Sequence, residues 1–300
     1  MKMRTAPESN YKSIWLESGK TMRFAIDPSK EITELEYPEF YDVKFSGSNC
    51  YGRCEFCYMD ETPEVKGEYD NVEKLTKFFD SIPDEHMPYQ IAYGPEIAHH
   101  PEFHDVMKLS HEYGVVGNFT TNGMWSKMFT EDEIKRHIET VKAYCGGVAI
   151  SINSHLEEYW RSAVEIYLEN NIRTNFHIII SDEESVDMFL SVFEEYKDRI
   201  EYFVLLPYKN VGRAVDNKKE LAWDYFVQKF PKDHKESIAF GALFYPYLLK
   251  RELDVKISLY EPETLSAYVE LKDGNIYPSS FSTEIVIGNI FVGGKFKNVI

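Results

Sequence analysis

The sequence is poor in cysteine, contains no long apolar run and has far fewer basic than acidic residues. Only 4 of its 300 residues are cysteine, which excludes a disulfide-rich secreted scaffold. No apolar run approaches the roughly 20 residues of a membrane-spanning helix, and the opening residues MKMRTAPESNYKSIW contain no apolar signal core. These absences predict a globular cytoplasmic protein that does not enter the membrane.

The charge balance bears on the partners of the protein. A formal net charge of −17 disfavours binding to phosphate backbones. The densest basic stretches, at residues 218–219 and 250–251, are short and flanked by acidic residues, so we expect no nucleic-acid partner. A hydrophobic content of 43% and an aromatic content of 15% are typical of a packed globule instead.

Three of the 4 cysteines lie within 8 residues, in the run NCYGRCEFCY. Cys50, Cys54 and Cys57 can converge on a common centre from one loop, and thiolates are the usual ligands of iron–sulfur clusters. Three local ligands leave one corner of a four-iron cubane open. A zinc site that adds a histidine is an alternative, although zinc motifs usually come as two separated ligand pairs. Cys145 precedes an apolar run and is expected to be a buried small residue.

From residue 41 onward, short β-rich runs alternate with amphipathic helical stretches, which is typical of βα units around a parallel sheet. Right-handed crossovers would curl six such units into a half-open barrel with its chemistry at the carboxyl ends of the strands. The cysteine loop follows the first strand, as this arrangement requires. We expect strands at residues 41–45, 89–93, 115–120, 147–152, 174–180 and 202–206, and helices at 71–81, 101–113, 131–144, 156–170 and 185–196.

The predicted fold class is therefore α/β, a partial TIM-like barrel of six βα units with a small C-terminal α+β extension. Residues 1–37 are expected to form a hairpin or cap, with strands at 12–16 and 22–26. Residues 38–215 form the barrel. Beyond it the alternation is lost, and residues 216–300 are assigned to the extension.

The cysteine spacing, with Phe56 before the last cysteine, resembles the cluster motif of the radical S-adenosylmethionine superfamily. The resemblance implies a [4Fe–4S] cluster held by Cys50, Cys54 and Cys57, with S-adenosylmethionine chelated to the open iron. In that family, reductive cleavage gives methionine and a deoxyadenosyl radical, which abstracts a hydrogen atom from the substrate. The resemblance also implies an electron donor of the flavodoxin or ferredoxin type.

Further segments resemble the cofactor contacts of this superfamily. A Gly-Pro-Glu turn stands where the family often has Gly-Gly-Glu, and a Thr-Asn-Gly sequence ends the third strand. Val211 begins a Val-Gly-Arg-Ala segment similar to one that packs beside adenine in many peptide-modifying members of the family. Each also has a plainer interpretation as a turn, a core aromatic or a satisfied polar layer. The cofactor-binding residues that the resemblance implies are Phe56, Tyr58, Gly94, Pro95, Glu96, Thr121, Asn122, Ser151, Asn153, Asn175, His177 and Val211.

Residues 268–290 resemble the C-terminal extension called SPASM or twitch. In those extensions a cysteine after Tyr-Pro binds an auxiliary cluster, whereas here Ser279 takes that place and no cysteine follows Cys145. We predict the shape of the extension without its cluster. Because SPASM-type enzymes mostly modify peptides or proteins, a ribosomally made peptide is the leading substrate class. A small-molecule or nucleotide substrate, a glycyl-radical activase and a non-catalytic iron–sulfur sensor or scaffold are the alternatives.

Overall fold

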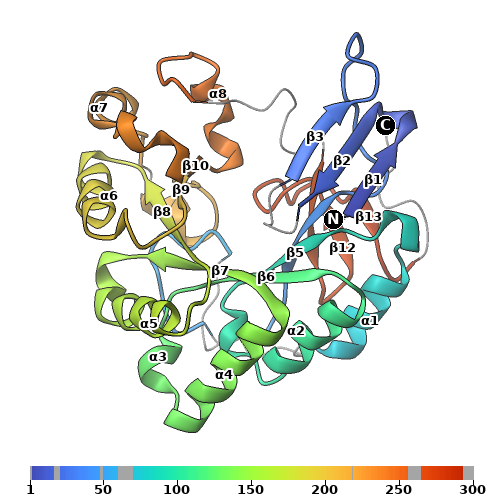
Figure 1. Cartoon of the computed structure of the whole chain (residues 1–300), viewed down its shortest axis with the longest axis horizontal. Helices are drawn as coiled ribbons and strands as arrows, with labels where there is room; N and C mark the ends of the chain where they lie inside the picture. The colour runs from blue at the N-terminus through green and yellow to red at the C-terminus, as the bar shows by residue number, and fades with distance from the viewer. Residues whose placement is uncertain are drawn as a thin grey trace.

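The computed structural model describes residues 2–16, 21–47, 50–59, 70–217, 219–255 and 265–292. Figure 1 shows a long sheet that curves into an arc, with helices along its outer side and a small N-terminal sheet near one end. Among these residues, no helix has the length and apolar character needed to cross a bilayer.

The main sheet runs in the order β10-β9-β8-β7-β6-β5-β4-β11-β12-β13. Neighbouring strands are parallel from β10 through β11, whereas β12 pairs antiparallel with β11 and with β13. Among the described strands the sheet does not close into a barrel, which confirms the partial barrel. The strands are β4 (Phe40–Lys44), β5 (Gln90–Gly94), β6 (Val116–Thr121), β7 (Cys145–Ile152), β8 (Thr174–Ile180), β9 (Phe203–Pro207), β10 (Ile238–Phe240), β11 (Ser266–Glu270), β12 (Asn275–Tyr277) and β13 (Gly288–Asn289).

Helices follow the strands, and side-chain caps fix where several begin. Asn71 accepts a hydrogen bond from the Lys74 amide, and Thr130 and Asp182 each form a capping box. The helices are α1 (Val72–Asp80), α2 (Phe103–Glu112), α3 (Trp125–Met128), α4 (Glu131–Tyr144), α5 (Glu157–Glu169), α6 (Glu183–Tyr196), α7 (Trp223–Lys229) and α8 (Tyr245–Leu248). Short 3-10 turns are η1 (Pro7–Ser9), η2 (Asp84–His86), η3 (Ile97–His99), η4 (Ser154–Leu156), η5 (Gly212–Asn217), η6 (Lys232–Ser237) and η7 (Ala242–Phe244).

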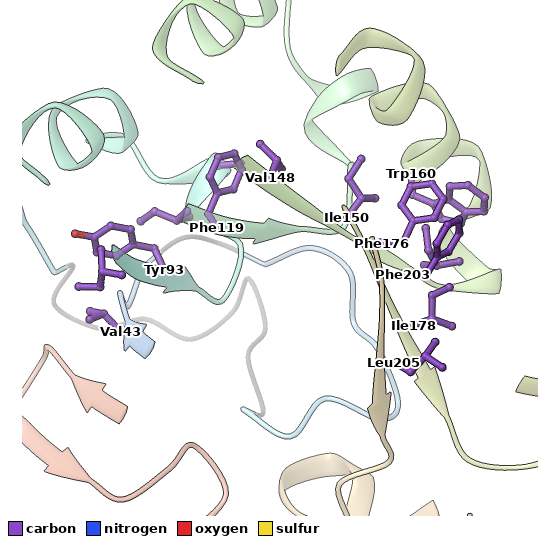
Figure 2. Close-up of a cluster of buried hydrophobic side chains, with 14 of the residues drawn as sticks. Val43, Tyr93, Phe119, Val148, Ile150, Trp160, Phe176, Ile178, Phe203 and Leu205 are labelled. Atoms are coloured by element: carbon purple, nitrogen blue, oxygen red, sulfur yellow. The ribbon is translucent and has the colours of Figure 1, made fainter. Parts of the chain in front are cut away.

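One face of the curved sheet carries the hydrophobic core. Along β4 to β9, every second residue is buried against the helices. Burial of each large side chain contributes about 1.5–3 kcal/mol. Figure 2 shows these side chains on six neighbouring strands, together with Trp160 of α5: Val43, Tyr93, Phe119, Val148, Ile150, Phe176, Ile178, Phe203 and Leu205.

The opposite, inner face of the sheet has a different chemistry. Most alternate residues of β4 to β8 on this face are small or polar and keep some exposure to solvent, whereas Ile179, Val204 and Leu206 add apolar side chains toward β9. The middle of the inner face is therefore lined mainly with hydrogen-bonding groups, which are Asp42, Gln90, Asn118, Thr120, Ser151, Asn175 and His177, interspersed with Ala92, Gly147 and Ala149.

Residues assigned to the C-terminal extension contribute strands beside both ends of the predicted six-stranded sheet. Ile238 in β10 pairs with Phe203 in β9, and Ser266 in β11 pairs with Phe40 in β4. These parallel pairings join segments far apart in the chain, so the local sequence pattern does not reveal them. The six predicted strands and five predicted helices are all present, each with bounds within about two residues of those expected.

The N-terminal sheet comprises β1 (Lys2–Ala6), β2 (Tyr11–Trp15) and β3 (Thr21–Ala25), all antiparallel. It contains the predicted hairpin, whose turn at residues 17–20 lies outside the described residues, and adds β1. Glu39, buried just before β4, accepts two hydrogen bonds of 3.1 Å from the Arg23 guanidinium and one from the Tyr11 hydroxyl. These bonds to the buried Glu39 attach the sheet to the start of the barrel.

A buried histidine lies within the core beneath β6. The His137 ring stacks on Phe103, 5.0 Å away, and its Nε2 is 2.7 Å from the Tyr167 hydroxyl. Burial, and secondarily the neighbouring His99, lower the pKa of His137 to about 3. The ring is therefore neutral in the folded protein at pH values where an unfolded chain would protonate it.

We predict that this histidine makes the fold acid-sensitive. Because its folded pKa lies below the unfolded value of 6.5, unfolding takes up a proton between the two values. Stability should fall by up to about 1.4 kcal/mol per pH unit as the pH drops below 6.5. Urea unfolding at several pH values should give a shallower slope for His137→Gln. The same slope in His137→Gln, wild type and the surface control His111→Gln would contradict the prediction.

Candidate functional site

The three clustered cysteines lie together at the carboxyl end of β4. Within residues 50–59, the Cys57 amide donates to the Cys54 carbonyl at 3.1 Å, which makes a tight turn between the last two thiols. All three cysteines are partly buried. The structure thus confirms that the loop follows the first barrel strand, where parallel strands present functional groups.

A second segment, just after β9, holds this loop in place. The Arg213 amide donates to the Cys57 carbonyl at 3.1 Å, and its Nε donates to the Cys54 carbonyl at 3.2 Å. Gly212 has φ +62°, and a Cβ there would lie 2.6 Å from the Tyr58 carbonyl oxygen. Only glycine permits this approach of the two backbones. The Val-Gly-Arg-Ala segment therefore clamps the cysteine loop.

Burial governs the charge state of the thiols. It raises the pKa of Cys50 to about 12 and that of Cys54 to about 11, and neighbouring negative groups add to both increases. A coordinated metal removes the thiol proton because its positive charge stabilises the thiolate. The donor set of three thiols on one loop therefore fits an iron–sulfur cluster in its chemistry. Within the described residues, no group of three His, Cys, Asp or Glu side chains is placed to hold a metal ion.

Glu96 joins the ends of two strands beneath the loop. Its buried carboxylate accepts the Thr121 hydroxyl at 2.6 Å and the Asn122 amide at 2.7 Å. Burial raises the pKa of Glu96 to about 7, against the effect of these two hydrogen bonds. The Asn122 side-chain amide in turn donates to Cys50 Sγ at 3.9 Å. The predicted residues Glu96, Thr121 and Asn122 therefore form one network that reaches the first cysteine.

A carboxylate can accept about four hydrogen bonds, so Glu96 retains acceptor capacity for an ammonium group. Gly94 ends β5 on the inner face, and a Cβ there would meet nothing closer than the Met59 Cε at 4.0 Å. Pro95 follows it in a cis peptide bond. The Gly-Pro-Glu turn thus leaves open space beside the cysteine loop.

The aromatic residues of the loop have defined neighbours. The Phe56 ring packs edge-on against His155 at 6.1 Å, and His155 Nε2 lies 3.1 Å from the Gly52 carbonyl oxygen. The Tyr58 ring lies under the Lys209 ammonium at 3.8 Å. Both aromatic residues therefore contribute to the folded shape of the loop, which is compatible with a further role in binding adenine.

The predicted polar residues of the fourth and fifth barrel strands are neighbours on the inner face. Ser151 in β7 pairs in register with His177 in β8, and Asn175 faces the same interior. Burial lowers the pKa of His177 to about 4, so its ring is neutral. The Asn175 Oδ1 is buried with no hydrogen-bond partner among the described residues. Asn153 lies just beyond β7, and its carbonyl accepts the Trp160 indole N–H at 3.2 Å.

The fold brings near the cysteine loop four charged residues that no sequence motif singled out. Asp42 and Lys44 point inward from β4, Glu270 points inward from β11, and Lys209 follows β9. The Asp42 side chain keeps contact with solvent, but the protein that surrounds it desolvates the carboxylate and raises its pKa to about 6. The Lys209 ammonium opposes this shift. The alternation in the run Tyr41–Phe45 was the available signal, since it places Asp42 and Lys44 on one face.

A polar pocket of about 260 Å³ lies between the cysteine loop and the C-terminal extension. Lys44 and Glu270 form an ion pair of 3.6 Å at its wall. The Val211 segment and the extension supply other sides, and Ser279 nearby has a buried hydroxyl with no partner among the described residues. The lining residues are Lys44, Tyr58, Met59, Val211, Gly212, Tyr268, Glu270, Ser280, Phe281, Thr283 and Glu284.

Comparison with solved structures identifies proteins of the same architecture. Streptococcus suis SuiB bound to its precursor peptide SuiA matches with a TM-score of 0.64 and 14% identity, over 86% of this chain and 64% of SuiB. SuiB bound to S-adenosylmethionine matches with a TM-score of 0.60 and 13% identity, over 82% of this chain and 61% of SuiB. The protein anSMEcpe, with bound AdoMet and the Cp18Cys peptide, matches with a TM-score of 0.54 and 16% identity, over 84% of this chain and 77% of anSMEcpe.

No protein-family model and no curated protein sequence matches the chain. The chain spans about 64% of the length of SuiB in the highest-scoring of these comparisons. At identities of 13–16% the likeness is one of fold. This chain therefore has the open α/β barrel fold of SuiB and anSMEcpe.

We predict that Gly212→Ala disrupts the clamp on the cysteine loop. The positive φ and the contact with the Tyr58 carbonyl should together cost at least about 2 kcal/mol. Gly147→Ala is the matched control, because its nearest contact would be an ordinary 3.4 Å, and it should change stability by less than about 0.5 kcal/mol. Urea unfolding and bound iron per chain measure the effect. Equal stability and equal iron content in the two variants would contradict the claim that Gly212 holds the cysteine loop in place.

Proposed function

We propose that this chain is a radical S-adenosylmethionine enzyme that modifies a peptide or protein. The observation that carries the proposal is the three-cysteine loop at the carboxyl end of β4, beside the Glu96–Asn122 network, in an open barrel with a polar inner face. The fold likeness to SuiB with its precursor peptide and to anSMEcpe with a peptide supports the substrate class.

When bound, a [4Fe–4S] cluster and S-adenosylmethionine supply a deoxyadenosyl radical that takes a hydrogen atom from the substrate. Cys50, Cys54 and Cys57 would hold the cluster. Asn122 orients the first of these thiols through its side-chain amide, and Glu96 holds Asn122 in place. Glu96 also offers a carboxylate to the cofactor's ammonium group.

The remaining predicted contacts would orient the cofactor and exclude water. Phe56 and Tyr58 would flank adenine together with Val211, whose segment clamps the loop. The inner-face residues Ser151, Asn153, Asn175 and His177 are assigned to the ribose or carboxylate. The unpartnered Asn175 Oδ1 supports this assignment, because a buried acceptor is stabilised when a ligand donates to it.

The pocket beside Tyr58 is the proposed place of the reacting substrate group. Its wall contains the Lys44–Glu270 pair, so it suits a polar group rather than an aliphatic one. An electron donor of the flavodoxin or ferredoxin type would reduce the cluster, and the cytoplasm is the proposed location. The size and polarity of the pocket also favour a second candidate, a small polar molecule as substrate.

The function is tested with anaerobically reconstituted full-length chain. With dithionite and S-adenosylmethionine, wild type should form 5′-deoxyadenosine and methionine, and Cys54→Ala should reduce this to background because a cluster ligand is lost. Cys145→Ala is the control and should retain the activity, since Cys145 lies at the start of β7. Mass spectrometry of candidate peptides should then reveal a mass change that depends on S-adenosylmethionine.

Several outcomes would count against the proposal. Stoichiometric zinc without a brown chromophore would refute the cluster. A cluster without any cleavage of S-adenosylmethionine would favour a non-catalytic sensor or scaffold. Unchanged peptides alongside turnover of a metabolite would favour the small-molecule candidate, and a glycyl radical formed on a partner enzyme would favour an activase.

A further inference from the structure

Lys209 has no role in the proposed function, yet it connects the cysteine loop to the C-terminal extension. Its Nζ lies 3.8 Å from the centre of the Tyr58 ring and 5.1 Å from that of Phe281. The same Nζ donates to the Ser280 hydroxyl at 3.1 Å. A single ammonium thus contacts the residue after Cys57 and two residues of the extension.

The charge of this ammonium is largely shielded from water. Burial lowers the pKa of Lys209 to about 8, and the carboxylate of Asp42 opposes that shift. Lys209 therefore stays mostly protonated at neutral pH. Because its surroundings are less polarisable than water, its electrostatic effect on nearby groups exceeds that of a surface lysine.

Tyr58 links this charge to the cysteine loop. It follows Cys57 directly in the chain, and its carbonyl packs against Gly212. The Arg213 amide fixes the Cys57 carbonyl at 3.1 Å. With the backbone held at Gly212 and Arg213, and the ring held at Lys209, the Cys57 end of the loop has little freedom to move.

We propose that Lys209 is a positioning residue for the cluster: its ammonium holds Tyr58, fixes the Cys57 end of the loop, and raises the reduction potential of a cluster bound there. The inference rests on the proposed function, because it concerns a cluster held by the three cysteines. Reduction adds an electron, so a nearby positive charge stabilises the reduced form and a negative charge opposes it. Asp42 should therefore act in the opposite direction.

The test is a redox titration of the reconstituted full-length chain, followed by electron paramagnetic resonance. Lys209→Met keeps the stem and removes the charge, so the midpoint potential should shift to lower values and the spectrum of the reduced cluster should change. Lys209→Arg should restore both toward wild type. Asp42→Asn removes the opposing charge and should shift the potential upward.

Lys250→Met is the matched control. Lys250 is exposed and its Nζ lies 5.4 Å from the Tyr247 ring, so the substitution removes an equal charge from a similar contact in solvent. It should leave potential and spectrum unchanged. Loss of iron in Lys209→Met with recovery in Lys209→Arg would also support the positioning role.

Three results would overturn the inference. The first is a potential and spectrum in Lys209→Met that equal those of wild type and Lys250→Met. The second is loss of iron in both Lys209 variants, and the third is a shift of the potential in the same direction for Lys209→Met and Asp42→Asn. Neither of the last two could result from the ammonium charge. A wild-type chain that gives no cluster signal would instead refute the proposed function, so the two failures are distinguishable.

Discussion

The alternation of side chains along the parallel strands is the constraint on which the rest of the structure depends. Bulky residues such as Tyr93 and Phe176 face the helices and supply the burial energy, whereas Ala92, Asn175 and their neighbours face inward. Small and polar residues make up most of the inner face of β4 to β8, so the burial energy there comes mainly from the outer face. The polar groups that the proposed cofactor and substrate would need thus lie on the face that the core does not use.

Close backbone contact, rather than a long list of side-chain bonds, fixes the cysteine loop over that space. Gly212 brings the segment after β9 against Tyr58, and Arg213 bonds to both cysteine carbonyls. From the other side, Glu96 and Asn122 connect the ends of β5 and β6 to Cys50. The loop therefore depends on the ends of β5 and β6, which lie on one side of β4, and on the segment after β9, further along the same side of the sheet.

Local patterns predicted the repeated units well because helix periodicity, capping residues and strand alternation act over a few residues. Thr130 and Asp182 cap helices that begin at Glu131 and Glu183, each within two residues of the predicted start. The three cysteines were also readable, because their spacing is a local property. By contrast, Asp42 and Lys209 were not identified, since their proximity joins β4 to the segment after β9 and no short-range pattern encodes it.

The sequence alone determined the succession of βα units, the thiol cluster on a single loop, and the absence of a further cysteine beyond Cys145. Only the tertiary structure decided that β10 and β11 extend the sheet on either side, that Glu96 bonds to Asn122, and that Lys209 lies over Tyr58. The reason is physical. Periodicity and spacing are set by neighbouring residues, whereas pairing and charge proximity arise when distant segments pack together.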